Sequence, residues 1–460
     1  MTTRFDAIII GTGQAGPSLA ARLSAAGMQV AIIERKFFGG TCVNTGCIPT
    51  KALVASAYAA HLARRAEDYG VKINDAVEVD MKRVKARKDE ISARSRNGVE
   101  KWLKGLANCK VFEGHARFDS ADTVQVNGET LNAGRIFINV GTRPFIPPMP
   151  GLDQVRYLTN STMMDVDFLP EHLLVVGGSY VGLEFAQMYR RFGCTVTVVE
   201  KSSRLISRED EDVTDAVRTI LTNEGITVEL HAECMAAQKR GEQIAITLDC
   251  SDGSREAIGS HLLLAVGRTP NTDDLGLERA GIAVDERGYV TVDDELHTNV
   301  PGVWALGDCN GRGAFTHTSY NDYEIVADNL LNGERRSLRD RIPAYALFID
   351  PPLGRVGMSE SQIRESGRKA LVGTRPMTRV GRAVEKGETQ GFMKIAVDAD
   401  TKQILGAAIL GVGGDEAVHC LLDTMYAKAP YTVVQRAVHI HPTVSELLPT
   451  VLGDLKPLGN

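Results

Sequence analysis

Cysteine and long apolar runs are both scarce in this chain. Eight cysteines stand among 460 residues, which is too few, and too scattered, for the disulfide scaffold of a small secreted protein. No uncharged apolar run is long enough to span a bilayer, so we expect no membrane partner. The first residues enter a strand-like run at once and leave no room for a signal peptide. We therefore expect a cytoplasmic protein.

The charge balance gives no reason to expect a nucleic acid partner. The sequence has 58 acidic and 52 basic residues, a net charge of −6, which repels polyanions. The basic stretch Lys82–Lys88 is followed by Asp89 and Glu90, which favours a solvated helix face. With 43% hydrophobic and 24% charged residues, the composition is that of an ordinary globular chain, and its length predicts about three domains.

Glycine is in excess, at 45 residues against 17 prolines, which indicates close approaches of backbone rather than linkers. Phe5–Gly16 reads FDAIIIGTGQAG, an apolar run that ends in a GxGxxG pattern. A helix-like stretch and a second apolar run follow, closed by Glu34. In such a unit the first glycine allows a tight turn, the second lets the backbone approach a pyrophosphate, and the third permits close packing of the helix on the sheet. The acid accepts a hydrogen bond from a ribose hydroxyl. The glycines are Gly11, Gly13 and Gly16.

The same pattern returns at Leu173–Glu200. Glu200 follows the first glycine by 23 residues, the spacing between Gly11 and Glu34 in the first unit. The three turn positions are held by Gly177, Ser179 and Gly182. Ser179 departs from the pattern but is still small. A structural βαβ unit without ligand is the alternative, and two copies with matching acids disfavour it. Two dinucleotide sites predict two nucleotides that exchange electrons, a flavin and a nicotinamide.

The acid of the second unit also bears on the choice of nicotinamide. Glu200 can accept a hydrogen bond from the free 2′-hydroxyl of NADH, and it repels the 2′-phosphate of NADPH. Lys201 and Arg204 lie near it in sequence and weaken this preference. We expect NADH, with NADPH as a possible donor.

Cys42 and Cys47 form the one close cysteine pair in the sequence, within GGTCVNTGCIPTK at 39–51. Their spacing is not common for zinc and no second pair completes four ligands, so we expect no metal site. Helix geometry places positions five apart about 140° out of line, so a bond between them needs a distorted first turn. Gly46 and Pro49 permit that distortion. A helix N-terminus lowers the pKa of a thiol, which favours the reactive thiolate. The alternative interpretation is that both cysteines are buried structural residues.

This stretch resembles the active-site segment of the class I pyridine nucleotide-disulfide oxidoreductases, the FAD flavoprotein disulfide reductases, and the resemblance covers essentially the whole chain. It implies bound FAD, NAD(P)H as donor and a homodimer. The implied fold is α/β, with two Rossmann-like dinucleotide-binding domains, for FAD and NAD(P), and a C-terminal α+β dimerisation domain. The expected FAD-binding domain comprises 1–150 and 271–340, the NAD(P)-binding domain 151–270 and the dimerisation domain 341–460.

The resemblance also implies roles for catalytic side chains. Cys47 matches the cysteine nearest the flavin, which forms a charge-transfer complex, and Cys42 matches the interchange thiol that meets the substrate. Lys51 matches the lysine beside flavin N5, and Glu184 matches its ion-pair partner. Tyr180 matches the aromatic gate over the flavin where the nicotinamide docks.

Further cofactor-binding residues follow from three segments that resemble family motifs. The segment FINVGTRP at 137–144 is similar to the strand that crosses between domains, and LLLAVGRTP at 262–270 is its counterpart. In TNVPGVWALGD at 298–308, the last residue matches the acid that bonds a ribityl hydroxyl. Together with the cysteine stretch, these segments contribute Gly40, Thr41, Gly141, Thr142, Gly267 and Asp308.

The segment HPTVSE at 441–446 matches the family's base motif. The resemblance implies that His441 reaches the partner subunit's interchange thiol and that Glu446 orients it. Apolar and polar residues alternate just before this motif, which predicts a strand that places His439 and His441 on one face, with a helix starting at Pro442. We expect His439 to be structural.

The sequence leaves the electron acceptor open. Ser179, the segment 183–187 and the segment 307–309 resemble the mercuric-reductase-like branch, and two stretches, 315–326 and 348–360, resemble its reactive-chlorine-resistance flavoproteins. This branch implies a soft metal ion, Hg(II) or Cu(II), or another oxidant as acceptor, although no vicinal cysteine pair near the C-terminus is present to relay mercury. The alternatives are dihydrolipoyl dehydrogenase or another small-disulfide reductase, and a non-catalytic redox sensor. Whether Cys309 or the tyrosines at 320–323 take part stays open.

Overall fold

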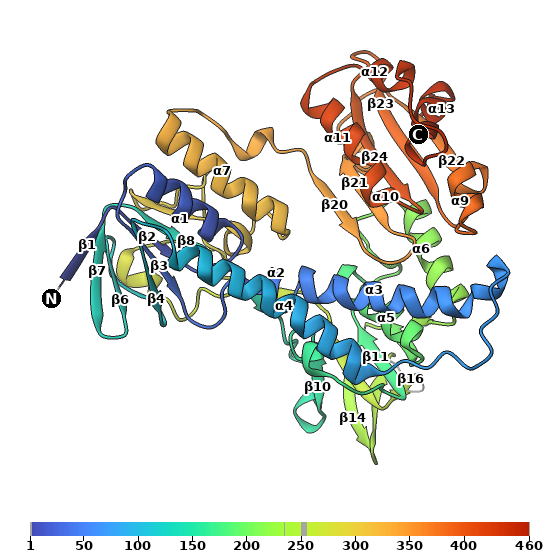
Figure 1. The fold of residues 1–460 in the computed structure, drawn as a ribbon, viewed down its shortest axis with the longest axis horizontal. Coiled ribbons are helices and arrows are strands. Elements are labelled where there is room, and N and C mark those ends of the chain that lie inside the picture. Colours follow the sequence, from blue (N-terminus) through green and yellow to red (C-terminus); the bar gives the residue numbers. More distant parts are fainter. Residues whose placement is uncertain (1, 234, 250–254, 460) are drawn as a thin grey trace.

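The first Rossmann-like unit is built around a parallel sheet (Figure 1). Its central strand, β2 (Ala7–Ile10), is buried along its whole length. The computed structural model describes residues 2–233, 235–249 and 255–459. Helix α1 (Ala15–Ala25) connects the second and third strands. The sheet order is β19 (Val303–Ala305), β8 (Ile136–Ile138), β2 (Ala7–Ile10), β3 (Val30–Glu34) and β4 (Cys109–Glu113). Because β19 comes from far along the chain and pairs with β8, this unit is built from two separate segments.

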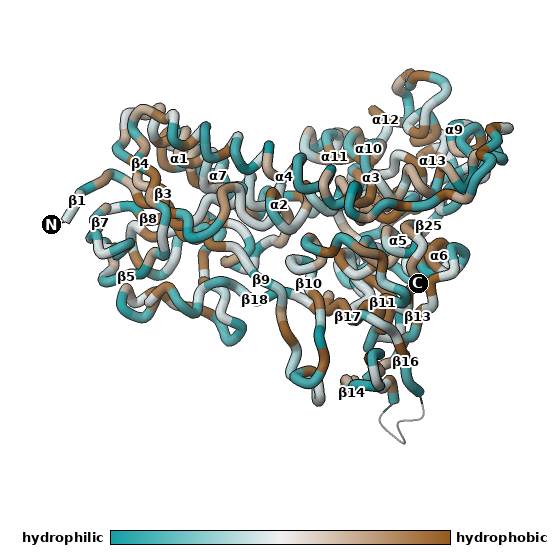
Figure 2. Tube along the Cα trace, turned by 60° about the horizontal axis from the view of Figure 1, so that its bottom comes forward, coloured by the Kyte–Doolittle hydropathy of each residue, from teal (hydrophilic) through white to brown (hydrophobic). Residues whose placement is uncertain are grey.

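The second Rossmann-like unit has its own parallel sheet, covered by α5 (Tyr180–Phe192) and α6 (Glu211–Asn223). Its order is β10 (Tyr157–Thr159), β17 (His261–Leu264), β11 (His172–Val176), β12 (Thr195–Val199) and β13 (Thr227–Glu229). An antiparallel sheet of β14 (Ala236–Arg240), β15 (Gln243–Thr247) and β16 (Glu256–Gly259) lies beside it. Apolar residues gather along β3 and β11 (Figure 2), as strands buried on both faces require.

Two short strands connect the Rossmann-like units. Strand β9 (Thr142–Pro144) pairs antiparallel with β18 (Arg268–Pro270). These strands belong to the two segments that the sequence indicated as paired crossovers. Long helices complete the connection, since α3 (Cys47–Arg64) packs against both α4 (Met81–Lys104) and α5. The cysteine stretch at the start of α3 therefore lies where the two nucleotide-binding units meet.

The C-terminal part of the chain is a six-stranded antiparallel sheet with helices beside it. Its order is β20 (Ala344–Leu347), β21 (Leu353–Gly357), β24 (Ile404–Leu410), β23 (Phe392–Asp398), β22 (Ala370–Pro376) and β25 (Lys456–Pro457). The helices include α11 (His419–Tyr426), α12 (Thr432–Arg436) and α13 (Leu448–Gly453). Within the described residues, no helix is both long enough and apolar enough to cross a bilayer. The predicted fold class, two Rossmann-like units and an α+β domain, is confirmed.

One local prediction was wrong. The residues around His439 and His441 do not form a strand, and the next helical turn begins at Ser445 rather than at Pro442. Val438 and Ile440 are 101% and 79% exposed, so the apolar residues of the alternation have no core to pack against within the described part of the chain. Alternation predicts a strand only where one face is buried and a neighbouring strand is available.

Candidate active site

The two close cysteines lie on separate helices. Cys42 is in α2 (Gly40–Asn44), and Cys47 is the first residue of α3. The backbone leaves helical geometry at Thr45 and Gly46, with φ −127° and ψ −121° at Gly46. A Cβ at Gly46 would lie 2.9 Å from the Thr41 carbonyl oxygen, so glycine is needed at the break. This break supplies the distortion that the spacing of the cysteines required.

The surroundings of the two thiols favour a thiolate at one of them. Hydrogen bonding between the thiols raises the pKa of Cys42 and lowers the pKa of Cys47 to about 6. The Thr316 hydroxyl lies 3.2 Å from the Cys47 sulfur and lowers this pKa further, as does the positive charge of Lys51. Cys47 is exposed, whereas Cys42 is half-buried. The geometry therefore supplies a nucleophilic sulfur at neutral pH and a second thiol within reach of it.

A charged pair links the cysteine helix to the second Rossmann-like unit. The Lys51 ammonium donates to Glu184 Oε2 at 2.8 Å, and the Glu184 side chain is 7% exposed. The backbone N–H of Phe348 donates to the other carboxylate oxygen at 3.1 Å, and the Lys51 nitrogen lies 4.4 Å from the centre of the Phe348 ring. The lysine is thus held by a carboxylate and a ring, each from a different domain.

The first glycine turn leaves no room for side chains. A Cβ at Gly11 would lie 2.3 Å from the Asn139 carbonyl oxygen, and one at Gly16 would lie 2.3 Å from the Gly11 carbonyl oxygen. A Cβ at Gly40 would lie 2.9 Å from the Gly13 Cα, so the cysteine stretch approaches the turn backbone to backbone. This cradle, at a helix N-terminus, fits the pyrophosphate of a dinucleotide.

Glu34 and Glu200 hold matching positions in the two units. Glu34 Oε2 accepts from the Thr12 backbone N–H at 3.0 Å and from its hydroxyl at 2.6 Å. Glu200 Oε2 accepts from the Gly178 backbone N–H at 2.6 Å and Oε1 accepts from the Ser202 N–H at 2.9 Å. Both carboxylates are fixed against their glycine turns with acceptor capacity left for a ribose hydroxyl.

The second glycine turn repeats the geometry of the first. A Cβ at Gly177 would lie 2.4 Å from the Ala265 carbonyl oxygen, and one at Gly182 would lie 2.0 Å from the Gly177 carbonyl oxygen. Ser179 is the N-cap residue of α5, and Tyr180 is its first residue. Substitution of the middle glycine by serine therefore leaves the turn intact, because its backbone is extended, at φ −113°.

Asp308 is placed by the two crossover segments. Its Oδ2 accepts a 3.0 Å hydrogen bond from the Thr142 hydroxyl, which in turn accepts one of 2.6 Å from Arg268 Nε. Burial raises the pKa of the Asp308 carboxyl, and the positive charge of Arg268 opposes that rise. Gly141 and Gly267 immediately precede the crossover strands β9 and β18. A second Arg268 nitrogen lies 3.5 Å from the Thr41 hydroxyl, so the arginine links this acid to the cysteine stretch.

Most of the chain matches one family of known proteins. A sequence profile of the pyridine nucleotide-disulphide oxidoreductases matches residues 5–322, and a profile of the family's dimerisation domain matches residues 343–452. The chain belongs to this family. Its members are FAD-binding oxidoreductases that use NAD(P)H, and the glycine turns described above fit those two dinucleotides.

Two relatives and one solved structure show where in the family the chain lies. It is 38% identical over 97% of its length, and 98% of the relative, to the probable pyridine nucleotide-disulfide oxidoreductase RclA of Escherichia coli (strain K12). It is 34% identical to a mercuric reductase of Streptomyces lividans, covering 97% and 95% of the two chains. The Cu(II) complex of the HOCl-induced flavoprotein disulfide reductase RclA from Escherichia coli superposes with a TM-score of 0.90 at 36% identity, covering 98% and 99%. The predicted branch of the disulfide reductase family is confirmed.

The histidine and glutamate of the base motif meet each other but lie away from the cysteines of the same chain. His441 Nδ1 lies 2.9 Å from Glu446 Oε2, and the His441 side chain is 82% exposed. The segment that carries them, between α12 and α13, is distant from α2 in both views (Figures 1 and 2). His439 contacts only the Ala437 carbonyl oxygen, at 3.3 Å, among the hydrogen bonds of the described residues.

The structure shows the surroundings of Cys309 and of the tyrosines at 320 and 323. Cys309 is fully buried, its thiol points at the Leu306 carbonyl oxygen 3.3 Å away, and burial raises its pKa to about 12. It therefore carries no accessible thiolate. Tyr320 and Tyr323 pack edge to face on α7 (Thr316–Asn332). Within the described residues, no group of three His, Cys, Asp or Glu side chains could hold a metal ion; Cys234 and Cys250 lie outside those residues.

Sequence reasoning missed several residues that surround the disulfide reductase site. Thr316 contacts Cys47, and Phe348 contacts Lys51. Arg268 contacts Thr142 and Thr41, which are cofactor-binding candidates. None of the three belongs to a spacing pattern. Thr316 and Phe348 stand inside the stretches 315–326 and 348–360 that resemble the mercuric-reductase-like branch, but that resemblance gave neither residue a role. Arg268 stands inside the crossover segment LLLAVGRTP, and its signal was its position between two strands that approach each other. The other two depend on where α7 and the C-terminal domain dock, which no local pattern specifies.

Proposed function

We propose that the chain is an NAD(P)H-dependent dithiol reductase that passes electrons through Cys42 and Cys47 to a soft metal ion, Cu(II) or Hg(II), or to another oxidant. The observation that carries the proposal is the lowered pKa of the exposed Cys47 beside the half-buried Cys42. A thiolate with a neighbouring thiol is the ligand set that soft ions prefer. A copper complex of RclA, the 36% identical protein described above, supports the choice of Cu(II).

Electrons and protons are conserved in the proposed reaction. Bound FAD supplies a two-electron relay between the nicotinamide and the cysteine pair. The reduced pair gives up two electrons, reduces two Cu(II) ions to Cu(I) or one Hg(II) to Hg(0), and closes to a disulfide as Cys42 loses its proton. The ion pair with Glu184 holds the Lys51 ammonium beside the cysteine pair. NAD(P)H then restores the dithiol and leaves as NAD(P)⁺.

Further side chains complete the proposed site. Tyr180 covers the face where the nicotinamide docks, Asp308 bonds the ribityl chain, and Glu200 favours NADH. His441, oriented by Glu446, exchanges the protons of the partner subunit's Cys42. That role requires a homodimer, which the dimerisation domain and the exposed apolar residues beside His441 support. The glycines of the two turns, together with Gly40, Thr41, Gly141, Thr142 and Gly267, surround the cofactors.

An anaerobic titration tests the proposal. The holoenzyme is reduced with one equivalent of NADH or NADPH, and Cu(II), Hg(II), lipoamide and glutathione disulfide are then offered separately while the flavin spectrum is followed. We expect rapid reoxidation by a metal ion, and its loss in Cys42→Ser. Rapid reoxidation by lipoamide alone would overturn the metal assignment and establish a dihydrolipoyl dehydrogenase. Turnover no faster than that of free flavin with every acceptor would instead indicate a redox sensor.

A further inference from the structure

Tyr180 packs against two other aromatic rings, each from a different domain. The Tyr345 ring, on β20, lies 5.5 Å from the Tyr180 ring with the planes at 83°. The Phe315 ring, just before α7, lies 6.1 Å from it at 90°. Phe315 and Tyr345 are themselves stacked, 5.6 Å apart at 11°. Edge-to-face packing of this kind is favourable beyond the area it buries, so Tyr180 rests edge to face against a pair of stacked rings.

The Tyr345 ring is itself anchored. Its hydroxyl donates a short hydrogen bond to Glu209 Oε1. Glu209 is 2% exposed, and among the described residues its other oxygen has no hydrogen bond, although Arg355 Nη1 lies 3.7 Å from it. The Tyr345 phenol is therefore the one hydrogen-bond donor that this buried carboxylate has in the described chain. Loss of that donor would leave a buried acceptor unsatisfied.

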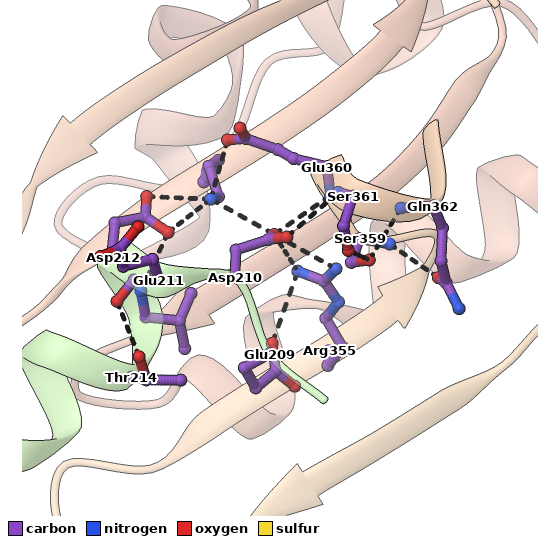
Figure 3. Close-up of polar contacts among 12 residues, drawn as sticks. Glu209, Asp210, Glu211, Asp212, Thr214, Arg355, Ser359, Glu360, Ser361 and Gln362 are labelled. Carbon is purple, nitrogen blue, oxygen red and sulfur yellow. Dashed lines mark hydrogen bonds and ion pairs between the residues drawn. The ribbon is translucent and has the colours of Figure 1, made fainter. Parts of the chain in front are cut away.

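The loop that carries Glu209 is attached at both of its ends. At one end, the Ile206 backbone N–H donates to the Gly178 carbonyl oxygen of the second glycine turn at 2.9 Å. At the other, Asp210 accepts from the Glu360 backbone N–H at 3.1 Å and lies 3.5 Å from Arg355 (Figure 3). The loop therefore joins the nicotinamide turn to the C-terminal domain, and Glu209 holds Tyr345 from that rigid connection.

We propose that Tyr345 and Glu209 are positioning residues that hold Tyr180 in its resting orientation, and so set how readily the nicotinamide is admitted. The inference rests on the proposed function, because it takes Tyr180 as the residue that covers the nicotinamide face. Tyr180 must leave its two ring contacts for the nicotinamide to dock. An anchored Tyr345 stabilises the resting orientation, and the apparent dissociation constant of the dinucleotide rises in proportion as the open fraction falls.

The test is Tyr345→Phe, which keeps the ring and removes the hydroxyl. In the FAD-loaded enzyme, we expect the dissociation constant of NAD⁺, measured by titration calorimetry without turnover, to fall about threefold. The limiting rate of flavin reduction at saturating NADH should change by less than the binding constant does. A merely structural defect would instead weaken binding and slow reduction together.

Two variants make the result specific. Tyr58→Phe removes another tyrosine–glutamate bond between domains, the 2.7 Å contact of Tyr58 with Glu388, and should leave NAD⁺ binding unchanged. Glu209→Leu removes the acceptor of the Tyr345 hydroxyl and should tighten NAD⁺ binding as Tyr345→Phe does. Binding by Tyr345→Phe that equals or is weaker than that of the wild type overturns the inference, whereas a wild-type flavin that neither NADH nor NADPH reduces overturns the proposed function.

Discussion

The sulfur of Cys47 and the hydroxyl of Thr316 lie 3.2 Å apart, although 269 residues separate them in the sequence. Thr316 is the first residue of α7, so this contact joins the start of that helix to the start of α3. The hydroxyl donates a stronger hydrogen bond to a thiolate than to a neutral thiol, and so stabilises the thiolate form. It is therefore one of the groups that lower the pKa of Cys47.

Replacement of Thr316 by valine should raise the pKa of Cys47, because the thiolate loses a donor. A hydrogen bond to a charged group of roughly 1.5 kcal/mol corresponds to about a tenfold change in the ionisation equilibrium. The measurement is the rate of alkylation of the reduced protein by iodoacetamide between pH 5 and 9. Thr316→Ser, which keeps the hydroxyl, serves as control. Superimposable rate profiles for the wild type and the valine variant would show that the contact does not stabilise the thiolate.

The ionisation of Cys47 should also set a pH limit on the reduced enzyme. Hydrogen bonding from Cys42 lowers the pKa of Cys47 to about 6, so the thiolate prevails above pH 6 and is protonated as the pH falls through that value. The long-wavelength charge-transfer absorbance expected of a thiolate beside oxidised flavin should fall over the same range. Titration of the two-electron-reduced protein measures it. Absorbance that is unchanged down to pH 5 would place the thiolate pKa well below the expected value.

The two cysteines should differ in their effect on this absorbance. Cys47→Ser removes the sulfur assigned to the flavin, so the protein should retain FAD but lose the long-wavelength band entirely. Cys42→Ser keeps Cys47 and a hydroxyl that can donate to it, so the band should persist without any addition of reductant. Each variant is purified and its spectrum recorded with its FAD content. A band retained in Cys47→Ser would reverse the assignment of the two thiols.

Local patterns predicted the parts of this site that lie on single turns, and failed where domains meet. The two glycine turns and their acids could be located from spacing alone, because each forms one βαβ unit whose backbone leaves no room for a Cβ. The contact of Thr316 with Cys47 and the packing of Phe348 on Lys51 could not, since each depends on the docking of a separate domain. The expected strand before His441 failed for a different reason, because the alternating apolar residues Val438 and Ile440 are exposed and have no buried face to pack against.

The equivalence of the two turns can be tested with a matched pair of substitutions. Gly11 and Gly177 have φ of +106° and +114°, and a Cβ at either would lie within 2.4 Å of a carbonyl oxygen. Alanine therefore adds both a steric conflict and backbone strain of roughly 1–2 kcal/mol. Gly11→Ala should be purified largely without FAD. Gly177→Ala should keep its FAD but reduce it at least tenfold more slowly at a fixed, subsaturating NADH concentration, because only its nicotinamide turn is distorted.

Gly98→Ala supplies the control for this pair. Gly98 lies within α4, and apart from the helix's own backbone no atom of the described residues lies within 4 Å of where its Cβ would be. Alanine should therefore stabilise the helix by up to about 1 kcal/mol and alter neither cofactor. FAD content from the visible spectrum and stopped-flow flavin reduction separate the three variants. If Gly177→Ala loses FAD while Gly11→Ala retains it, the flavin and nicotinamide turns have been assigned in the wrong order; if both lose it, the second turn supports the fold rather than a separate dinucleotide.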